Sequence, residues 1–500
     1  MRKNGILMPL ASLPGNYGIG SFSKEAYVFI DKLKEAKQSY WQILPLGPTG
    51  YGDSPYQSFS TFAGNPYFVD LDTLVEEGLL TAAECRNYDW GKDPSKIDYE
   101  KIYLSRFKVL RQAYNRFKRK KDKQYKSFVE DNSFWLEDYA LYMSVKNLFG
   151  GVSFAQWDDD IRLRTKEGMK KYREKCEDET GFYKFIQYEF DKQWKALKSY
   201  ANKSGVEIIG DIPIYVAFDS ADTWAEPSLF MLDENIMPIA VAGTPPDAFS
   251  KTGQLWGNPL YNWKYHKETG YKWWIKRISH CLKLYDVVRI DHFRGFDEYY
   301  SIPYGEKNAV NGKWKKGPGY ALFRELKKEI GSARVIAEDL GFLTPSVLKL
   351  VKDTGFPGMK VLEFAFDSRE DSDYLPHNYD KNCIVYTSAH DNDTILGWYD
   401  SLSKADRKYA DDYLNNKGHT GEELAWDYIR LAMASVADTC IISMHDFLAL
   451  GSEARINVPS TLGGNWVWRM SSKAFNKRII RKIRFVTELY SRYPKVEKVK

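Results

Sequence analysis

Cysteine is scarce in this chain of 500 residues, which contains only five. They are Cys85, Cys176, Cys281, Cys383 and Cys440. Their number is odd, their spacing is wide, and no two form a CxxC pair. A framework of disulfides or a zinc site built on paired cysteines is therefore not expected. We interpret the five residues as reduced thiols and predict a cytoplasmic protein.

The chain also lacks long apolar stretches and a dominant charge. No segment approaches 18 consecutive apolar residues, so no membrane span is predicted. The apolar run near the first residue is too short for a secretory signal, and Pro9 and Pro14 interrupt it. Net charge is only +5, from 72 basic and 67 acidic residues. This balance gives no reason to expect nucleic acid or an anionic membrane as a partner, and it is compatible with a neutral substrate.

Several catalytic signatures are missing as well. The sequence has no GxxxxGK[ST] phosphate loop, no HExxH zinc motif and no GxSxG nucleophile elbow. The glycines of PGNYGIG (14–20) do not have the spacing of a dinucleotide-binding loop. We therefore predict neither a metal site nor a cofactor. Aromatic residues, in contrast, reach 15% of the chain, which suits a sugar-binding cleft, although most of the rings are expected to pack in the core.

Eight short runs rich in valine and isoleucine are present along the chain. They cover residues 5–10, 40–46, 206–216, 286–293, 333–341, 359–366, 383–391 and 440–450. Their nearly continuous apolar character is typical of strands buried on both faces of a parallel sheet. Helical patterns lie between several of them. Ser23 precedes one, and Thr344 with Pro345 opens another, in which Val347, Leu348 and Val351 are expected on one side and Gly355 ends the helix. The sequence thus predicts an α/β fold, a (β/α)8 TIM barrel.

Two stretches interrupt this alternation. Residues 67–204 are charged and rich in aromatics, with helical runs at 101–121 and 182–201, and residues 217–285 are rich in glycine, proline and tryptophan. We predict that residues 1–500 form a single catalytic barrel in which both stretches are large, mainly helical insertions in the βα loops. Barrels build their active sites from these loops.

Three of the predicted strands end in acidic residues, namely Asp291, Glu338 and Asp391. Since the carboxyl ends of barrel strands meet at one rim, we expect the three side chains to lie close together. Neighbouring carboxylates raise one another's pKa, and glycoside cleavage needs one protonated and one ionised carboxyl group. The spacing leaves other interpretations open. Asp291 and Arg289 could form a structural ion pair, Glu338 could lie in a solvated turn, and Asp391 could be a turn or helix-capping residue.

Longer motifs favour the catalytic interpretation of these acidic residues. They are WQILPLGPTGYGDSPYQSFSTFAGNPY (41–67), GDIPIYVAFDSADTWAEP (210–227), VAGTPPDAFSKTGQLWGNPLYNW (241–263), VRIDHFRGF (288–296), IAEDLG (336–341) and AHDNDT (389–394). On these motifs the chain resembles, almost end to end, the 4-α-glucanotransferases known as amylomaltases or disproportionating enzymes. These form glycoside hydrolase family 77 in the α-amylase superfamily. The resemblance also fits the absence of the C-terminal β-sandwich that is common in α-amylases.

The resemblance implies roles for individual residues. Asp291 matches the nucleophile, Glu338 the general acid/base and Asp391 the transition-state stabiliser. Arg289 matches the arginine beside the nucleophile, and His390 the histidine before the stabiliser. The remaining substrate-binding or supporting residues that it implies are Asp211, Tyr56, Trp256 and Asn457. Residues 241–259 match the loop that covers the active site of the family.

The activity implied is transfer of α-1,4-glucan segments from a maltodextrin donor to the 4-hydroxyl of an acceptor glucan or glucose. The mechanism would be a retaining double displacement without a cofactor, and the oligomeric state stays open. An α-glucan hydrolase with the same carboxylates and a non-catalytic glucan-binding protein are the alternatives. The chain departs from the family pattern at Ser388 and Ala389, where Gly and Thr are expected, and at Ser460, where Gly is usual.

Overall fold

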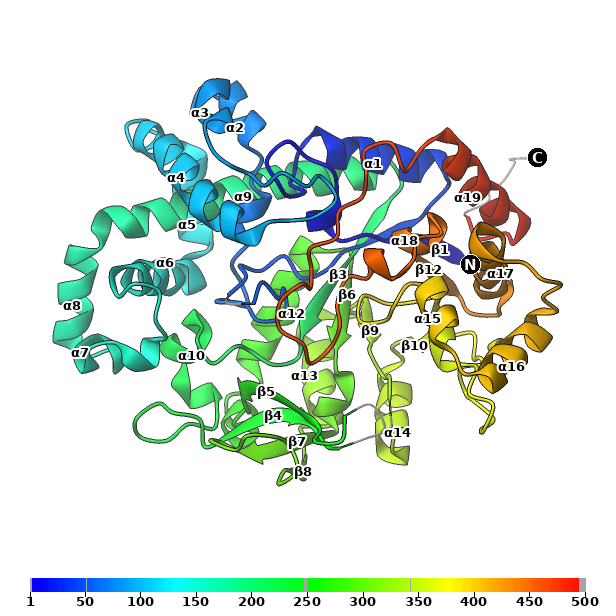
Figure 1. Ribbon diagram of the computed structural model, residues 1–500. Helices are drawn as coiled ribbons and strands as arrows, with labels where there is room; N and C mark the ends of the chain where they lie inside the picture. The colour runs from blue at the N-terminus through cyan, green and yellow to red at the C-terminus, as the bar shows by residue number, and fades with distance from the viewer. Residues whose placement is uncertain (1, 51, 247–249, 342, 494–500) are drawn as a thin grey trace.

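Eight parallel strands form a barrel at the centre of the protein, whose structure is a computed structural model that describes residues 2–50, 52–246, 250–341 and 343–493 (Figure 1). The strands are β1 (Lys3–Leu7), β2 (Tyr40–Gln42), β3 (Glu207–Pro213), β6 (Val287–Asp291), β9 (Val335–Ala337), β10 (Gly358–Val361), β11 (Cys383–Tyr386) and β12 (Thr439–Ser443). Each of the eight predicted runs overlaps one of them, although β1, β10 and β12 begin one or two residues before the predicted start. Their order, β10-β11-β12-β1-β2-β3-β6-β9, follows the chain once around the barrel. The predicted barrel is confirmed.

Side chains alternate between the barrel interior and the surrounding helices. On β6, Val287 packs with the interior cluster, while Val288 and Ile290 pack with the outer core. The residues between and after them, Arg289 and Asp291, therefore point inward, because side chains of a strand alternate with a period of two. This alternation explains why the runs are apolar throughout, and why the two charged residues of β6 share the inner face.

Two hydrogen bonds close the barrel between its first and last strands in the sheet order. The backbone N–H of Ala337 on β9 donates to the carbonyl of Pro357 just before β10, at 3.0 Å. The N–H of Met359 on β10 donates to Asp339 Oδ1, at 2.7 Å. The carboxylate of Asp339 thus accepts a hydrogen bond that a backbone carbonyl would accept in a regular strand pair. The segment that carries Glu338 is therefore bonded to β10.

Helices surround the barrel. Those of the outer layer are α1 (Lys24–Glu35), α9 (Glu177–Lys203), α12 (Lys272–Leu284), α13 (Tyr320–Ile330), α14 (Pro345–Thr354), α15 (Ile395–Ser401), α16 (Lys404–Leu414), α17 (Gly421–Ala434), α18 (Met444–Phe447) and α19 (Lys477–Leu489). In α14 the prediction for Leu348 is wrong. This side chain is 52% exposed, and Leu350 is buried with Val347 instead, because those two positions lie on the face toward the barrel. Gly355 ends the helix at φ 71°, as predicted.

The segment between β2 and β3 is helical and lies at the left and top of Figure 1. It contains α2 (Leu71–Glu76), α3 (Ala82–Arg86), α4 (Tyr99–Phe117), α5 (Lys123–Asp131), α6 (Ser133–Leu148), α7 (Asp159–Arg162) and α8 (Lys166–Lys175), followed by α9. Helix α9 contacts both α1 and β3, so it also serves as the barrel helix that leads into β3. Its buried Trp194 bonds through Nε1 to the carbonyl of Leu284.

A second sheet, which the sequence analysis did not predict, lies below the barrel in Figure 1. Its antiparallel strands, in the order β5-β4-β7-β8, are β5 (Gln254–Pro259), β4 (Ala240–Thr244), β7 (Glu298–Pro303) and β8 (Lys313–Lys316). In this sheet β4, from the predicted loop 241–259, pairs with β7, which follows β6 in the sequence. Residues 247–249 of that loop lie outside the described residues. Helices α10 (Ala221–Ala225) and α11 (Trp263–Glu268) flank β4 and β5 in sequence.

Short 3-10 helices complete the elements: η1 (Leu10–Ser12), η2 (Pro66–Phe68), η3 (Phe154–Gln156), η4 (Pro227–Leu229), η5 (Phe293–Phe296), η6 (Leu362–Phe364), η7 (Pro376–Asn378) and η8 (Ser452–Ala454). The five cysteines are buried, with free thiols. Within the described part of the chain, no helix is both long and apolar enough to cross a lipid bilayer.

The packing of β3 yields a stability prediction. A Cβ added at Gly210 would lie 2.1 Å from the ring of Tyr285, far inside van der Waals contact. Gly210→Ala should therefore lower the free energy of unfolding by about 1–3 kcal/mol, measured by urea denaturation. In a Tyr285→Ala background the ring is gone, and the same substitution should cost much less. Equal costs in the two backgrounds would show that the close approach to Tyr285 is not the cause.

Candidate active site

A buried arginine joins two acidic side chains inside the barrel. Arg289 donates from Nη1 to Asp211 Oδ2 on β3, at 2.6 Å, and from Nη2 to Asp291 Oδ1 at the end of β6, at 3.0 Å. The side chains of Asp211 and Arg289 are 0% and 3% exposed, whereas that of Asp291 is 29% exposed. We therefore assign Asp211 and Arg289 to the support of Asp291, the member of the three that a ligand at the rim can reach.

Glu338 lies beside Asp291, directly after the neighbouring strand β9. Ile290 faces Ala337 in the register of β6 and β9, so the residues that follow them, Asp291 and Glu338, are neighbours across the two strands. Strands in such a pair are roughly 4.8 Å apart. Two carboxyl groups thus project side by side from the rim.

The carboxylate of Glu338 is held by the backbone. It accepts the N–H of His292 at Oε2, at 2.6 Å, and the N–H of Leu340 at Oε1, at 2.8 Å. Burial, and then the charge of Asp291, raise the pKa of Glu338 to about 7, against the opposing effects of Arg289 and the two N–H groups. A proton can therefore reside on Glu338 near neutral pH.

A third carboxylate, Asp391, lies on the loop after β11. Its Oδ2 is 3.3 Å from His390 Nε2, and its Oδ1 accepts from Asn457 Nδ2 at 2.6 Å. Removal from water opposes ionisation, but His390 and the hydrogen bond from Asn457 prevail and lower the pKa of Asp391 to about 2. Asp391 is thus a stable anion, and its side chain is 47% exposed toward the rim.

Aromatic rings tie these groups together. The hydroxyl of Tyr56 donates to Asp211 Oδ2 at 2.8 Å, and its ring stacks on His390, with 5.0 Å between centroids. The ring of Trp466 lies 5.8 Å from that of Tyr56 and 6.1 Å from His390. On the opposite side, Trp256 of β5 packs edge-on against His292, 4.9 Å away. Second-sheet and loop residues therefore form walls around the carboxylates.

The structure brings the nine predicted site residues into one region. It also tests the alternative, structural interpretations of Asp291, Glu338 and Asp391. Arg289 and Asp291 do form an ion pair, which Asp211 shares. Glu338 is bonded to two backbone N–H groups rather than lying in a solvated turn. Asp391 does not cap a helix: Thr394 caps α15, accepting from the N–H of Gly397.

Two residues of this region were missed by the sequence analysis. His292 follows Asp291 in the left-handed region, with φ 53°. Burial, with the nearby charge of Arg294, lowers the pKa of His292 to about 3, so the ring is neutral. Trp466 comes from the GGNW segment near the end of the chain, and its φ is 64°. Neither position carries a glycine, the residue that most often marks a positive φ in a sequence.

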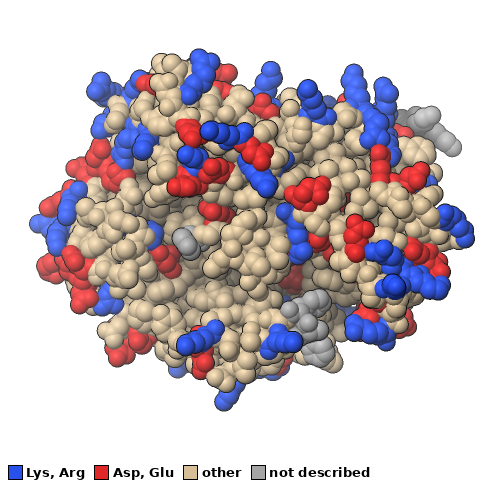
Figure 2. Space-filling view, in the orientation of Figure 1, with Lys and Arg blue, Asp and Glu red and all other residues tan. Residues whose placement is uncertain are grey.

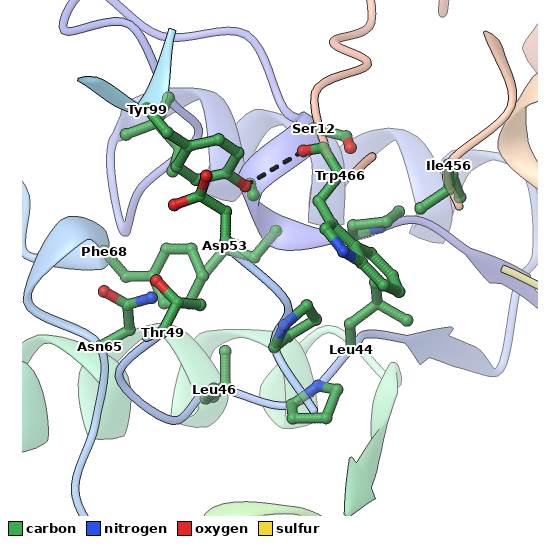
Figure 3. Close-up of a pocket in the computed structure, with 16 residues that line it drawn as sticks. Ser12, Leu44, Leu46, Thr49, Asp53, Asn65, Phe68, Tyr99, Ile456 and Trp466 are labelled. Atoms are coloured by element: carbon green, nitrogen blue, oxygen red, sulfur yellow. Dashed lines mark hydrogen bonds between the residues drawn. The ribbon is translucent and has the colours of Figure 1, made fainter. Parts of the chain in front are cut away.

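A small cavity beside Trp466 is not the substrate site. It has a volume of about 30 Å³ and is lined by Leu44, Tyr99 and Ile456, among others (Figure 3). Space of this size holds one or two water molecules, not a sugar. Burial raises the pKa of Asp53 on its wall to about 6. The exposed parts of Asp291 and Asp391 lie at the open rim instead. Lysine, arginine and acidic residues are interspersed over the face drawn in Figure 2, whose hollowed centre is largely uncharged.

Across the described ranges, no group of three histidine, cysteine or acidic side chains is arranged to hold a metal ion. The site presents three carboxyl groups, those of the adjacent Asp291 and Glu338 and that of Asp391 on the loop after β11.

Several known proteins that are similar in sequence to this chain share one description. A sequence profile described as 4-alpha-glucanotransferase matches residues 8–474. A 4-alpha-glucanotransferase of Clostridium butyricum is 51% identical over 97% of this chain and 100% of its own length. That of Thermus thermophilus is 46% identical over 94% of this chain and 95% of its own. The solved structure of an amylomaltase from Streptococcus agalactiae in complex with acarbose superposes with a TM-score of 0.96 at 41% identity, covering 99% of this chain and 100% of its own.

The raised pKa of Glu338 predicts a pH-dependent loss of stability. A carboxyl group whose pKa is higher in the folded than in the unfolded protein destabilises the fold as pH rises from its ordinary value, 4.5, through about 7. Glu338→Gln should therefore be more stable than the parent at pH 8, and the difference should vanish near pH 4, as measured by urea denaturation at both pH values.

A control of opposite sign is available at Glu84. Hydrogen bonds from Arg116 lower the pKa of Glu84 to about 2. Glu84→Gln should therefore be less stable than the parent at pH 8. If Glu338→Gln behaves like Glu84→Gln, the site does not favour the protonated form of Glu338.

Proposed function

Because the chain belongs to the 4-alpha-glucanotransferases of glycoside hydrolase family 77, it transfers segments of α-1,4-glucan, and we propose that it does so by a retaining double displacement at Asp291 and Glu338. One observation carries this mechanism: the two carboxyl groups are neighbours on adjacent strands but differ in environment. Arg289 is bonded to Asp291, while burial raises the pKa of Glu338 to about 7. One can act as a nucleophile and the other as an acid.

The separation of the two strands supports retention of configuration. Retaining glycosidases hold their carboxyl groups about 5–5.5 Å apart, whereas inverting enzymes leave room for a water molecule and hold them about 6.5–9.5 Å apart. Neighbouring positions on strands roughly 4.8 Å apart suit the shorter separation. The bond from Arg289 to Asp291 Oδ1 leaves Oδ2 for attack on the sugar.

In the first step, a carboxylate oxygen of Asp291 attacks the anomeric carbon of the donor glucan. The bond from this carbon to the glycosidic oxygen breaks, and Glu338 gives its proton to that oxygen. The shortened glucan leaves with a free 4-hydroxyl. The rest of the donor remains as a β-linked glucosyl ester on Asp291.

In the second step, Glu338 is a carboxylate and acts as a base. It takes the proton of the 4-hydroxyl of an acceptor, whose oxygen attacks the anomeric carbon and displaces Asp291. An α-1,4 bond forms, Glu338 is protonated again, and Asp291 is free. Two inversions give net retention, and no cofactor is consumed because the ester conserves the energy of the glycosidic bond.

We assign stabilisation of the transition state to Asp391. Its carboxylate is an anion fixed by His390 and Asn457 and partly exposed at the rim. Such a group can accept hydrogen bonds from sugar hydroxyls that strengthen as positive charge develops at the anomeric carbon. The rings of Tyr56 and Trp256 are proposed as subsite walls that pack against sugar faces and reduce the access of water.

The proposal also covers the substrates, the location and the domain organisation. We infer that maltodextrins and fragments of starch or glycogen are donors and that glucose can serve as an acceptor. We also infer a cytoplasmic location, because the five cysteines are buried thiols. The chain is proposed to be a single catalytic barrel, with the helices around 67–204 and the segment around 217–285 as insertions that shape the substrate cleft.

Maltotriose tests the reaction. Incubation should give glucose together with maltodextrins longer than maltotriose, resolved by chromatography, because the acceptor is a sugar. Asp291→Asn should lower turnover by several orders of magnitude while circular dichroism shows the parent fold. Glucose and maltose as sole products would indicate a hydrolase. An inactive parent protein that still binds amylose would indicate a glucan-binding protein.

The pH profile tests the role of Glu338 separately. Since Glu338 must carry a proton to act as an acid, kcat/KM should fall as pH rises through about 7. Arg289 opposes the rise in this pKa, so Arg289→Gln, though less active, should move the alkaline limb to higher pH. An alkaline limb that stays in place in Arg289→Gln would argue against Glu338 as its origin.

A further inference from the structure

The loop that carries His390 and Asp391 rests on a buried carboxylate with no part in the steps above. This residue, Asp446, lies in the short helix α18 directly after β12. Its side chain is 0% exposed, so it cannot touch a glucan. A fully buried carboxylate is costly unless its oxygens are bonded, and the partners of Asp446 show what the group does.

Asp446 accepts hydrogen bonds from both ends of the β11–α15 loop. Thr387 Oγ1 and Ser388 Oγ donate to Asp446 Oδ2, at 2.5 and 2.7 Å. The backbone N–H of Ile395 donates to Oδ1, at 2.8 Å. Two of these donors precede the His390–Asp391 pair and one follows it. A single side chain therefore fixes both ends of the segment that presents Asp391 to the rim.

Neighbours of Asp446 reinforce the first of these anchors. His445 Nε2 lies 3.1 Å from Ser388 Oγ, and Ser443 Oγ donates to the carbonyl of Ser388 at 2.9 Å. Burial lowers the pKa of His445, so its ring is neutral. Since Ser388 gives its hydroxyl proton to Asp446, the His445 Nε2–H can donate to Ser388 Oγ. Ser388 is one of the positions where the chain departs from the family pattern. Its hydroxyl links the loop to α18, and its backbone carbonyl links the loop to β12.

We propose that Asp446 is a positioning residue for glucan transfer: it holds the 387–395 segment so that Asp391 meets the sugar at the level of Asp291 and Glu338. This inference rests on the proposed function, in which Asp391 stabilises the transition state. Misplacement of a catalytic group by about 1 Å can cost about 100-fold in rate. Asp391 lies five residues beyond the end of β11, so the sheet alone does not fix its place.

The test is a double-mutant cycle on maltotriose disproportionation. In the parent protein, Asp446→Asn should lower kcat by about 10- to 100-fold, the range seen when buried groups that orient active-site ligands are changed. In an Asp391→Asn background, the same substitution should lower the residual kcat by less than about 3-fold, because the group that it positions is already lost. KM should change less than kcat.

Each outcome decides the inference. Equal effects of Asp446→Asn in both backgrounds would mean that Asp446 acts only on general stability, and parental kcat in Asp446→Asn would also overturn the proposal. If Asp391→Asn itself keeps parental activity, the role assigned to Asp391 in the proposed function fails, and the positioning role fails with it. Low activity of Asp391→Asn beside parental activity of Asp446→Asn overturns the positioning role alone.

Two further variants guard against loss of folding. Glu189 on α9 is another buried carboxylate, paired with Lys192 and placed in a helix away from the rim. Glu189→Gln should leave kcat per folded molecule at the parental value, whatever its effect on the melting temperature. If Asp446→Asn does not fold, Ser388→Ala and Thr387→Val each remove one donor and leave the carboxylate in place. Their effects on kcat should also vanish in the Asp391→Asn background, and additive effects would refute the proposal.

Discussion

The ion pairs of Arg289 are the interaction on which the site depends. A guanidinium and two carboxylates in a barrel interior are costly to remove from water, and they are stable there only because each satisfies the others. Asp211 could not be fully buried without Arg289, and the Tyr56 hydroxyl that bonds to Asp211 would lose its partner. Removal of one member of such a buried set costs about 3–5 kcal/mol. The side chain of Asp291 is therefore held in place by its bond to the buried Arg289.

Around this core, three rim carboxyl groups occupy three different environments. Asp291 is paired with an arginine, Glu338 is buried against two backbone N–H groups and a neighbouring charge, and Asp391 is surrounded by His390 and Asn457. The pKa values of Glu338, about 7, and of Asp391, about 2, differ for that reason. The proposed mechanism uses this difference, because it needs a proton on Glu338 and an anion at Asp391.

The barrel and the core of the site were predictable because they depend on local patterns. Continuous valine and isoleucine runs predict buried parallel strands, and their period of two places Arg289 and Asp291 on one face. The second sheet was missed because β4 and β7 pair across β6 in sequence, so no local period marks the sheet. Trp466 and His292 were missed because their place depends on positive φ angles and on distant partners. Leu348 was misplaced because the buried face of α14 is set by its contact with the barrel, which residue spacing alone did not define.

The carboxyl groups are also positioned by two different means. Asp291 is the last residue of β6 and Glu338 directly follows β9, so the hydrogen-bond register of the sheet sets their separation. Asp391 has no such constraint, because its loop leaves the sheet at Tyr386. A loop at that distance from a strand would sample several positions unless other bonds held it, and each position would meet the sugar differently. The buried bonds from Thr387, Ser388 and Ile395 to Asp446 supply that constraint, and in the proposed mechanism the exposed carboxylate of Asp391 meets the glucan.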